Sequence, residues 1–238
     1  MLSKSFTGWN MAKAADSYRY ERKFTISELS RHEIREMIRL HPALFLQIYP
    51  PRFVNNVYLD SVVLKNYFDT VDGVAERVKI RIRWYGGLFG LIEKPVLEFK
   101  IKKGLVGTKK SYPMDPFSLD GDFSSETVAC AFQHSDIPEV RKLQLTMLKP
   151  TLLNRYHRRY YRSADGNYRV TLDSDMEFYS VGTDSNSHLR KYADFSNTVL
   201  ELKYDRDKDQ AAQDIVNLFS FRMTRNSKYL NGIEKTIL

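Results

Sequence analysis

Hydrophobic and polar residues alternate with a period of two along most of the middle of the chain. This is the period of a strand that has one face against a core and the other face turned away from it. Gly86-Gly87 and Asp165-Gly166-Asn167 supply turns between such segments. The pattern predicts strands at residues 17–25, 55–60, 75–85, 95–103, 109–114, 151–162, 168–173, 176–180 and 197–204.

Other segments have the spacing of a helix. Ser30 and Glu33 form a capping box for a helix that ends near His41-Pro42. Further helices are predicted at residues 125–134, 138–147 and 208–221, the last with Ile215, Leu218 and Phe219 on one face. Because strands dominate and most are joined by short turns, we expect an α+β, mainly β fold built on an antiparallel, closed or nearly closed sheet.

The chain of 238 residues carries no internal repeat, low-complexity tract or long linker. We therefore expect one domain over residues 18–238, preceded by a loosely held leader at residues 1–17. An aromatic content of 13% is too high for a disordered chain, and this length supports a sizeable core. The single cysteine, Cys130, excludes an internal disulfide framework and is expected to be a small buried residue in a reducing compartment.

No segment approaches the roughly 18 apolar residues that a membrane-spanning helix needs. The most apolar stretch, residues 42–48, stops at Pro50-Pro51. The first residues contain scattered lysines and no continuous apolar segment, which disfavours a secretory signal. We expect a cytoplasmic protein that does not itself insert into a membrane, and the sequence leaves a membrane-protein partner open.

Charge adds the informative feature. Lys and Arg number 37 against 29 Asp and Glu, a formal charge of +8, which favours anionic partners. The polar positions of the predicted strands are repeatedly charged, as in residues 79–84 (KIRIRW), where three cations alternate with Ile80, Ile82 and Trp84. Residues 20–24, 96–102, 169–173 and 199–204 have the same pattern.

These charged faces have two interpretations. They are either solvated outer faces with cross-strand ion pairs, each worth about 0.2–1 kcal/mol, or the inner face of a closed sheet. An inner face of this kind would repel itself unless a polyanion and metal ions occupied the interior. Arginine grips phosphate oxygens in pairs, and carboxylates hold hard cations that bridge phosphates.

The chain resembles the VTC (vacuolar transporter chaperone) polyphosphate polymerase domain over roughly residues 18–233. Each motif is weak alone, and the order of the motifs carries the resemblance. The motifs are RYERK at 19–23, VYLD at 57–60, RIRWYG at 81–86, EFK at 98–100, RYHR at 155–158, RVTLD at 169–173, VLELK at 199–203 and NSKYLNG at 226–232.

This resemblance implies membership of the triphosphate tunnel metalloenzymes, whose eight-stranded antiparallel closed barrel, with helices outside, encloses a basic tunnel. It implies a Mn²⁺- or Mg²⁺-dependent transfer of the terminal phosphoryl group of ATP, or another nucleoside triphosphate, onto inorganic polyphosphate. Other branches hydrolyse triphosphates or tripolyphosphate, or cyclise ATP. Hydrolase and cyclase branches carry Glu-x-Glu-x-Lys on the first strand; here Arg19 replaces the first Glu, which favours the polymerase branch.

The resemblance also assigns expected roles to individual residues. Those expected to hold the reacting phosphates are Lys23, Arg81, Arg83, Lys100, Arg158 and Lys228. Those expected to bind substrate elsewhere are Arg155, Arg169, Lys203, Lys109 and Lys110. Glu201 is the expected metal ligand, with Glu21 and Glu98 as auxiliary carboxylates. Because Tyr160-Tyr161 replaces a small-aromatic pair, the sequence leaves open whether Arg155 or Arg158 faces inward, and it leaves the same question for Lys109 and Lys110.

Two other classes of function remain. A triphosphatase of the same fold would use the same residues, and a non-catalytic module would bind polyphosphate or nucleotide without turnover. The five histidines are scattered, with no pair spaced for zinc hydrolysis, and no phosphate-binding P-loop is present. The charged strand faces are unlike the aromatic face of an RNA-binding sheet, so no specific nucleic acid is expected.

Overall fold

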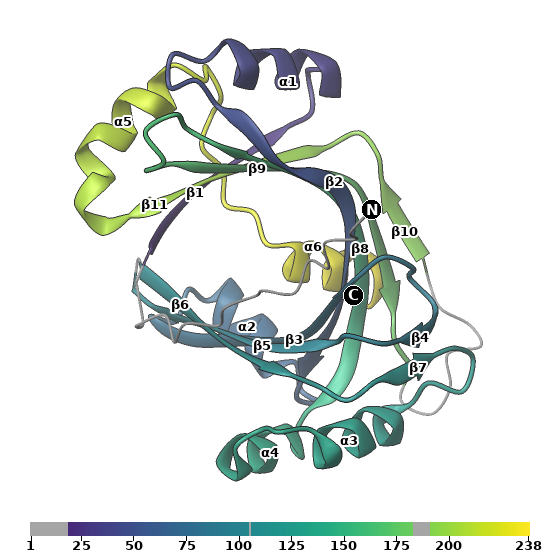
Figure 1. Cartoon of the computed structure of the whole chain (residues 1–238). Helices are drawn as coiled ribbons and strands as arrows, with labels where there is room; N and C mark the ends of the chain where they lie inside the picture. The colour runs from purple at the N-terminus through teal and green to yellow at the C-terminus, as the bar shows by residue number, and fades with distance from the viewer. Residues whose placement is uncertain (1–18, 105, 183–190) are drawn as a thin grey trace, which may run out of the picture.

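Eight antiparallel strands follow one another around a closed ring. The structure is a computed structural model that describes residues 19–104, 106–182 and 191–238, so the expected leader lies outside the described residues. The order around the ring is β9-β11-β1-β6-β5-β3-β2-β8, and β8 pairs back with β9 (Figure 1). These strands are β1 (Arg19–Ile26), β2 (Leu46–Asp60), β3 (Glu76–Tyr85), β5 (Val96–Lys103), β6 (Val106–Pro113), β8 (Lys149–Arg162), β9 (Arg169–Ser180) and β11 (Thr198–Asp205).

The ring is joined unevenly. β1 and β11 pair along the whole of β1, whereas β1 meets β6 only at Arg19 and Gly107. The ring is therefore closed most weakly between β1 and β6.

Helices and short strands surround this ring. The remaining elements are α1 (Arg31–Leu40), α2 (Lys65–Val71), β4 (Gly90–Ile92), β7 (Phe117–Leu119), α3 (Ser125–His134), α4 (Glu139–Leu145), β10 (Lys191–Asp194), η1 (Arg206–Lys208), α5 (Asp209–Asn217) and α6 (Lys228–Thr236). No helix within the described ranges is long and apolar enough to span a bilayer.

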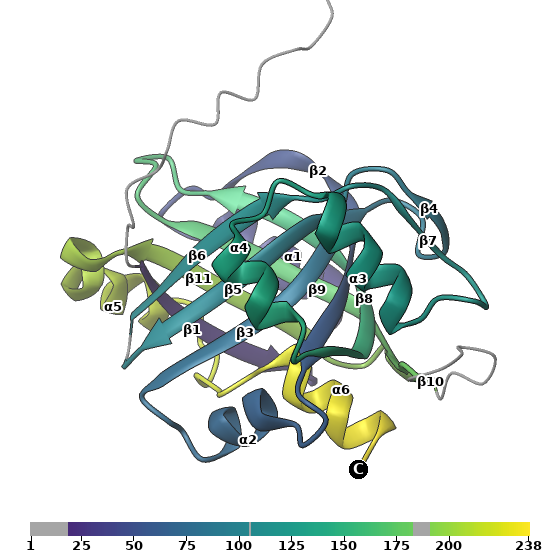
Figure 2. The ribbon, with the colours of Figure 1, turned by 90° about the horizontal axis from the view of Figure 1, so that it is seen from below.

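The apolar faces of the strands point outward and are covered by these helices. One core cluster packs the outer faces of β2, β3 and β5 against α3 and α4, which Figure 2 shows lying across this wall. A second cluster packs β1, β9 and β11 against α1 and α5. Since the apolar faces look outward, the charged faces of the same strands look into the ring.

One helix packs differently from the others. α6 lies across one end of the ring, where Tyr229 and Ile233 pack among Val54, Leu152 and Phe178 on the inner wall (Figures 1 and 2). A third apolar cluster therefore closes this end of the ring from within, next to the inward-facing charged residues.

The predicted fold class is confirmed, and the differences lie in individual elements. β2 begins nine residues earlier than predicted, at Leu46, and passes through Pro50-Pro51. These prolines fall where β2 has only β8 beside it and the register shifts, so their missing N–H groups break no ladder.

The two strands predicted at 168–173 and 176–180 form one strand, β9. A bulge lies between Asp173 and Met176, where Asp175 has a φ of 51°. The extra residue resets the alternation, so that Asp173 and Met176 both face inward.

Other predictions about local structure were wrong. α5 ends at Asn217, since the chain turns at Ser220 with a φ of 54°, and Leu218 is 55% exposed instead of packing beside Phe219. Cys130 is exposed on α3 and not buried. The helices α2 and α6 and the strands β4, β7 and β10 were not predicted.

We expect Gly232→Ala to destabilise the protein. A Cβ at this position would meet the side chain of Leu152 and would lie 2.8 Å from Phe178 Cδ1. Overpacking of this kind costs about 1–3 kcal/mol in the free energy of unfolding, measurable by urea denaturation. Gly121→Ala is the control, because its Cβ would meet nothing within 4 Å, and equal losses in both variants would contradict this packing of α6.

Candidate functional site

The inner wall of the ring is lined with cations that share a few carboxylates. The inward residues of β3 and β5 meet at Glu98, which is 3% exposed. Its carboxylate forms ion pairs with Arg81 at 2.7 Å, Lys109 at 2.6 Å and Arg83 at 3.6 Å. Burial alone would raise the pKa of Glu98, but these three cations hold it far below its ordinary value.

Arg83 reaches the neighbouring strands as well. It donates to Asn56 Oδ1 at 2.9 Å and to the Tyr156 hydroxyl at 3.2 Å. Burial raises the pKa of Tyr156, but Arg158 and Arg83 more than offset this and lower it to about 8. Arg83 is therefore held in place from both β2 and β8.

A second carboxylate, Asp173, is completely buried at the α6 side of the charged section. Arg158 binds it through two nitrogens at 2.6 and 2.7 Å, and Lys228 Nζ binds it at 2.6 Å. Burial acts to raise the pKa of Asp173, yet Arg158 and Lys228 lower it to about 2. Lys228 is the first residue of α6, so this cluster connects the end helix to the ring wall.

The third carboxylate, Glu201, lies between these two clusters and β1. Lys203 approaches it at 3.3 Å, Lys23 at 3.8 Å and Arg158 at 3.9 Å. Burial opposes ionisation, but Lys203 and Lys23 hold the pKa of Glu201 well below its ordinary value. Glu201 therefore remains a carboxylate at neutral pH.

Cations outnumber carboxylates where β1, β3 and β5 meet. Glu21 pairs with Lys100 at 2.7 Å, while among the described residues Lys79 has only the Ser227 hydroxyl as a partner, at 2.7 Å. Burial, together with Lys23 and Lys100, lowers the pKa of Lys79 to about 7. Burial also lowers the pKa of Lys100, although Glu21 opposes this. Within the described ranges, this part of the interior therefore has more lysine side chains than carboxylates to pair with them.

Two of the expected substrate-binding residues lie on the outer face instead. Arg155 alternates with the inward Asn154 and Tyr156, and its guanidinium stacks over Phe53 at 3.7 Å. Lys110 stands beside the outward Phe99 in the β5–β6 register, whereas Lys109 stands beside the inward Lys100. Strand alternation therefore puts Arg158 and Lys109, rather than Arg155 and Lys110, inside.

The remaining expected substrate-binding residue, Arg169, lies toward the end of the ring opposite α6. Arg169 is exposed and pairs in register with Lys203, on the same face as Asp173. Partial desolvation of its guanidinium group and the nearby Arg19 lower the pKa of Arg169, which indicates further crowding of cations at this end of the ring.

Several inward residues that shape the interior were not predicted to have a role. Lys79 and Asp173 could have been found, because each follows the alternation set by Arg81 and Arg169. Thr171 lies on the same alternation, between Arg169 and Asp173, but carries no charge, and Asn154 had no such signal. Asn154 Nδ2 and Thr171 Oγ1 are buried, face inward and have no hydrogen-bond partner among the described residues, so both can serve a bound molecule.

The three expected metal carboxylates do not form one cluster. In the described ranges no group of three acidic, histidine or cysteine side chains could hold a metal. Glu21 and Glu201 are diagonal neighbours across the β1–β11 ladder, opposite Lys203 and Lys23, and both face inward. One or two carboxylates suit a hard divalent cation that keeps several waters and shares phosphate oxygens. Glu98, enclosed by Arg81 and Lys109, fits a metal less well.

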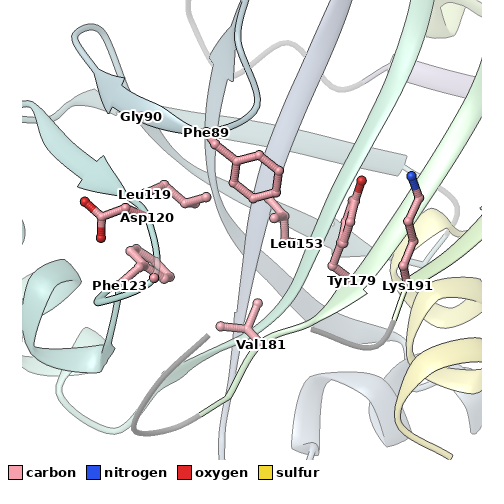
Figure 3. A pocket seen from close by; sticks show the side chains of 10 residues that line it. Phe89, Gly90, Leu119, Asp120, Phe123, Leu153, Tyr179, Val181 and Lys191 are labelled. Carbon is pink, nitrogen blue, oxygen red and sulfur yellow. The ribbon is translucent and has the colours of Figure 1, made fainter. Parts of the chain in front are cut away.

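A separate cavity of about 500 Å³ lies outside the ring wall (Figure 3). It is lined by apolar side chains that include Phe89, Leu119 and Leu153. Of its described lining residues, Asp120 and Lys191 carry charge, and Lys191 stacks over Tyr179 at 5.4 Å. Its chemistry differs from that of the ring interior, which is suited to a chain of phosphates.

Comparison with known proteins agrees with this arrangement. A family model described as VTC domain matches residues 18–237. The structure is similar to the putative adenylyl cyclase HpAC1 from Hippeastrum, described as having a dominant triphosphatase activity, with a TM-score of 0.52, 13% identity, and coverage of 93% of this chain and 97% of that chain. It is also similar to a putative adenylate cyclase from Bacillus halodurans, with a TM-score of 0.49, 15% identity, and coverage of 93% and 98%. No curated protein matches the sequence.

We expect Asp173→Asn to destabilise the fold strongly, because it leaves the largely buried Lys228 without its counter-charge and leaves Arg158, among the described residues, with only the weaker contact to Glu201 at 3.9 Å. Breaking a buried pair in this way costs about 3–5 kcal/mol in the free energy of unfolding, measured by chemical denaturation. The control is Asp205→Asn, whose side chain is 64% exposed and pairs with Arg19.

The direction in which the free energy of unfolding changes with pH follows from the pairing of Asp173 with Arg158 and Lys228. The contribution of Asp173 is complete above its unfolded pKa of about 3.9 and is lost as the pH falls toward about 2. Similar stabilities for Asp173→Asn and the original chain at neutral pH would show that the pair is not needed for the fold.

Proposed function

Because the chain belongs to the VTC domain family, we propose that it is a polyphosphate polymerase that uses ATP or another nucleoside triphosphate. One observation carries the proposal: cations from β1, β3, β5, β6, β8, β11 and α6 converge inside the ring in excess of the carboxylates available to pair with them. A linear polyanion supplies the missing charge along the length of the interior.

In this proposal the inward arginines and lysines bind the phosphates in different ways. Arg81, Arg83 and Arg158 present planar guanidinium groups, which bind phosphate oxygens through two parallel hydrogen bonds. Lys23, Lys100 and Lys228 act as point charges, with Lys109 and Lys203 beside them. Arg169 binds the part of the chain nearest the open mouth.

Glu201, with Glu21 beside it, would hold a Mn²⁺ or Mg²⁺ ion shared with phosphate oxygens. A bound divalent ion neutralises charge that develops on the transferred phosphoryl group. Glu201 can take this role because it remains ionised, and Lys203 and Lys23 keep it oriented toward the interior.

The chemistry needs no nucleophile from the protein. A terminal oxygen of the polyphosphate attacks the terminal phosphorus of the nucleotide, a new P–O bond forms, and the bond to the leaving nucleoside diphosphate breaks. Catalysis then consists of alignment and charge stabilisation, which the held guanidinium groups provide.

A triphosphatase is the second candidate, with water in place of the acceptor chain. The observation that favours it is the similarity in fold to the Hippeastrum protein described as having a dominant triphosphatase activity. Both reactions use the same phosphate-holding residues, so the acceptor decides between them.

The deciding experiment incubates the purified chain with ATP and either Mn²⁺ or Mg²⁺, and follows polyphosphate on a gel alongside released phosphate. We expect long chains of polyphosphate. Free phosphate alone would identify a triphosphatase, and tight binding of ATP or polyphosphate without turnover would identify a receptor.

We expect Glu201→Gln to lower the rate about 100-fold, the scale of losing a few kcal/mol of charge stabilisation, and to raise the concentration of divalent ion needed for half-maximal rate. Activity is measured across a range of metal concentrations, with a thermal melt to show that the variant folds. An active variant with unchanged metal dependence would remove Glu201 from the metal site.

Lys109 and Lys110 form a matched pair for mutation, since they are adjacent and face opposite sides of β6. We expect Lys109→Gln to lower the activity by about tenfold, the value of one charge-assisted hydrogen bond, and Lys110→Gln to leave it unchanged. Equal losses would contradict the assignment of the inner face as the substrate site.

Lys79 predicts proton uptake on binding. Above its pKa of about 7 this lysine is largely neutral in the empty ring, and a bound polyanion favours its charged form. At a pH about one unit higher, we expect tripolyphosphate binding without metal to consume a proton, seen calorimetrically as a binding heat that depends on the buffer. Lys79→Met should abolish the uptake, whereas the outward Lys110→Met should retain it.

A further inference from the structure

A second basic pocket lies on the outside of the ring, between α1 and the outer faces of β8 and β9. Its volume is about 250 Å³, several times the ~30 Å³ share of one water molecule. Arg31 and Arg35 enter it from one face of α1, one helical turn apart, and His157 and Arg159 enter from β8. Ser174 and Asp175 complete it at the bulge of β9.

This pocket does not connect to the ring interior through its side chains. His157 and Arg159 flank the inward Arg158 in the sequence, and strand alternation turns them to the opposite face. His157 packs against Phe53 with 5.2 Å between the centroids of the two rings, and the Phe53 ring also lies under the outward Arg155. A molecule bound here would therefore contact a different set of residues from one bound inside.

The charges in the pocket are unequally paired. Arg31 binds Asp175 through two nitrogens, at 2.7 and 2.8 Å, and also donates to the Phe195 carbonyl at 3.1 Å. This pair is neutral as a unit. Within the described ranges, Arg159 makes a single long hydrogen bond, to Gln47 at 3.4 Å, and Arg35 makes no hydrogen bond or ion pair.

Two guanidinium groups with free donors therefore face one pocket. Both also lie close enough to Tyr161 to act on its hydroxyl electrostatically. Guanidinium forks match phosphate oxygens in geometry, and a phosphoryl group near neutral pH carries −1.5 to −2 charges, which is close to the charge of two arginines.

We propose that this outer pocket is a binding site for a phosphoryl dianion, held by Arg35 and Arg159 with His157 as a third donor. Arg31 acts as a positioning residue, because it neutralises Asp175 and keeps that carboxylate from repelling the anion. The Ser174 hydroxyl donates to Asp175 Oδ2 at 3.2 Å and helps to hold that carboxylate at the pocket wall. The site is independent of the activity proposed for the interior.

His157 provides a local reporter for the test. Burial and the nearby Arg159 lower its pKa in the empty pocket, with Arg31 acting in the same direction and Asp175 and Asp173 opposing it. An anion beside the ring stabilises the imidazolium form and raises this pKa. Binding inside the ring leaves His157 without a new neighbour.

The experiment follows the imidazole signals of the full chain by NMR during pH titrations, with the His157 signal identified from a His157→Gln variant. Separate titrations use orthophosphate, pyrophosphate and, at matched ionic strength, sodium chloride. We expect a saturable rise in the pKa of His157 with orthophosphate or pyrophosphate and not with chloride. A response to orthophosphate assigns the site to a single phosphoryl group, and a response to pyrophosphate alone assigns it to condensed phosphates.

Variants on the same helix separate the site from general surface charge. Arg35→Gln and Arg159→Gln should each raise the dissociation constant for phosphate at least about tenfold, which corresponds to the loss of one charge-assisted hydrogen bond. Arg39→Gln is the matched control, because Arg39 is exposed on α1 and pairs with Glu36 at 2.6 Å. An equal response to chloride, no response to either phosphate, or unchanged binding in both pocket variants would overturn the proposal.

Discussion

Repulsion between like charges inside the ring determines how the strands and helices of this protein are arranged. Glu98, Asp173 and Glu201 each serve two or three cations, and all three remain ionised despite burial because those cations surround them. The lowered pKa of Lys79 shows that the positive charge around this lysine is not fully compensated by carboxylates. A charged interior of this kind supplies little net stability, since removing charges from water offsets most of what their attraction returns.

The stability must therefore come from outside the ring. The strands turn their apolar faces outward, and two separate clusters bury those faces beneath α3 and α4 on one side and α1 and α5 on the other. This reverses the usual arrangement in which a closed sheet hides its apolar residues within. The outer helices are consequently what allows the inner face to be given over to charge.

Much of this arrangement could be predicted from the sequence because period-two alternation and capping residues are local signals. Ser30 and Glu33 form the predicted capping box, and the predicted helix over 125–134 is α3. Alternation alone does not say which face of a strand looks inward, so the choice between Arg155 and Arg158 needed the neighbouring strands. The prolines of β2 and the bulge of β9 hid strand continuity, because both are tolerated only through pairing with residues far away in the sequence.

The bulge has a consequence for how the interior is divided. By resetting the alternation after Asp173, it places the charged Asp173 and the apolar Met176 and Phe178 on the same inner face. The charged section thus gives way within a few residues to the apolar cluster that holds α6, and Lys228, at the start of α6, reaches back to Asp173. Since the interior already has more cations than carboxylates, a bound polyanion can add contacts to the free donors without displacing this link. Binding of a polyanion, as proposed, and closure of this end by α6 are therefore compatible.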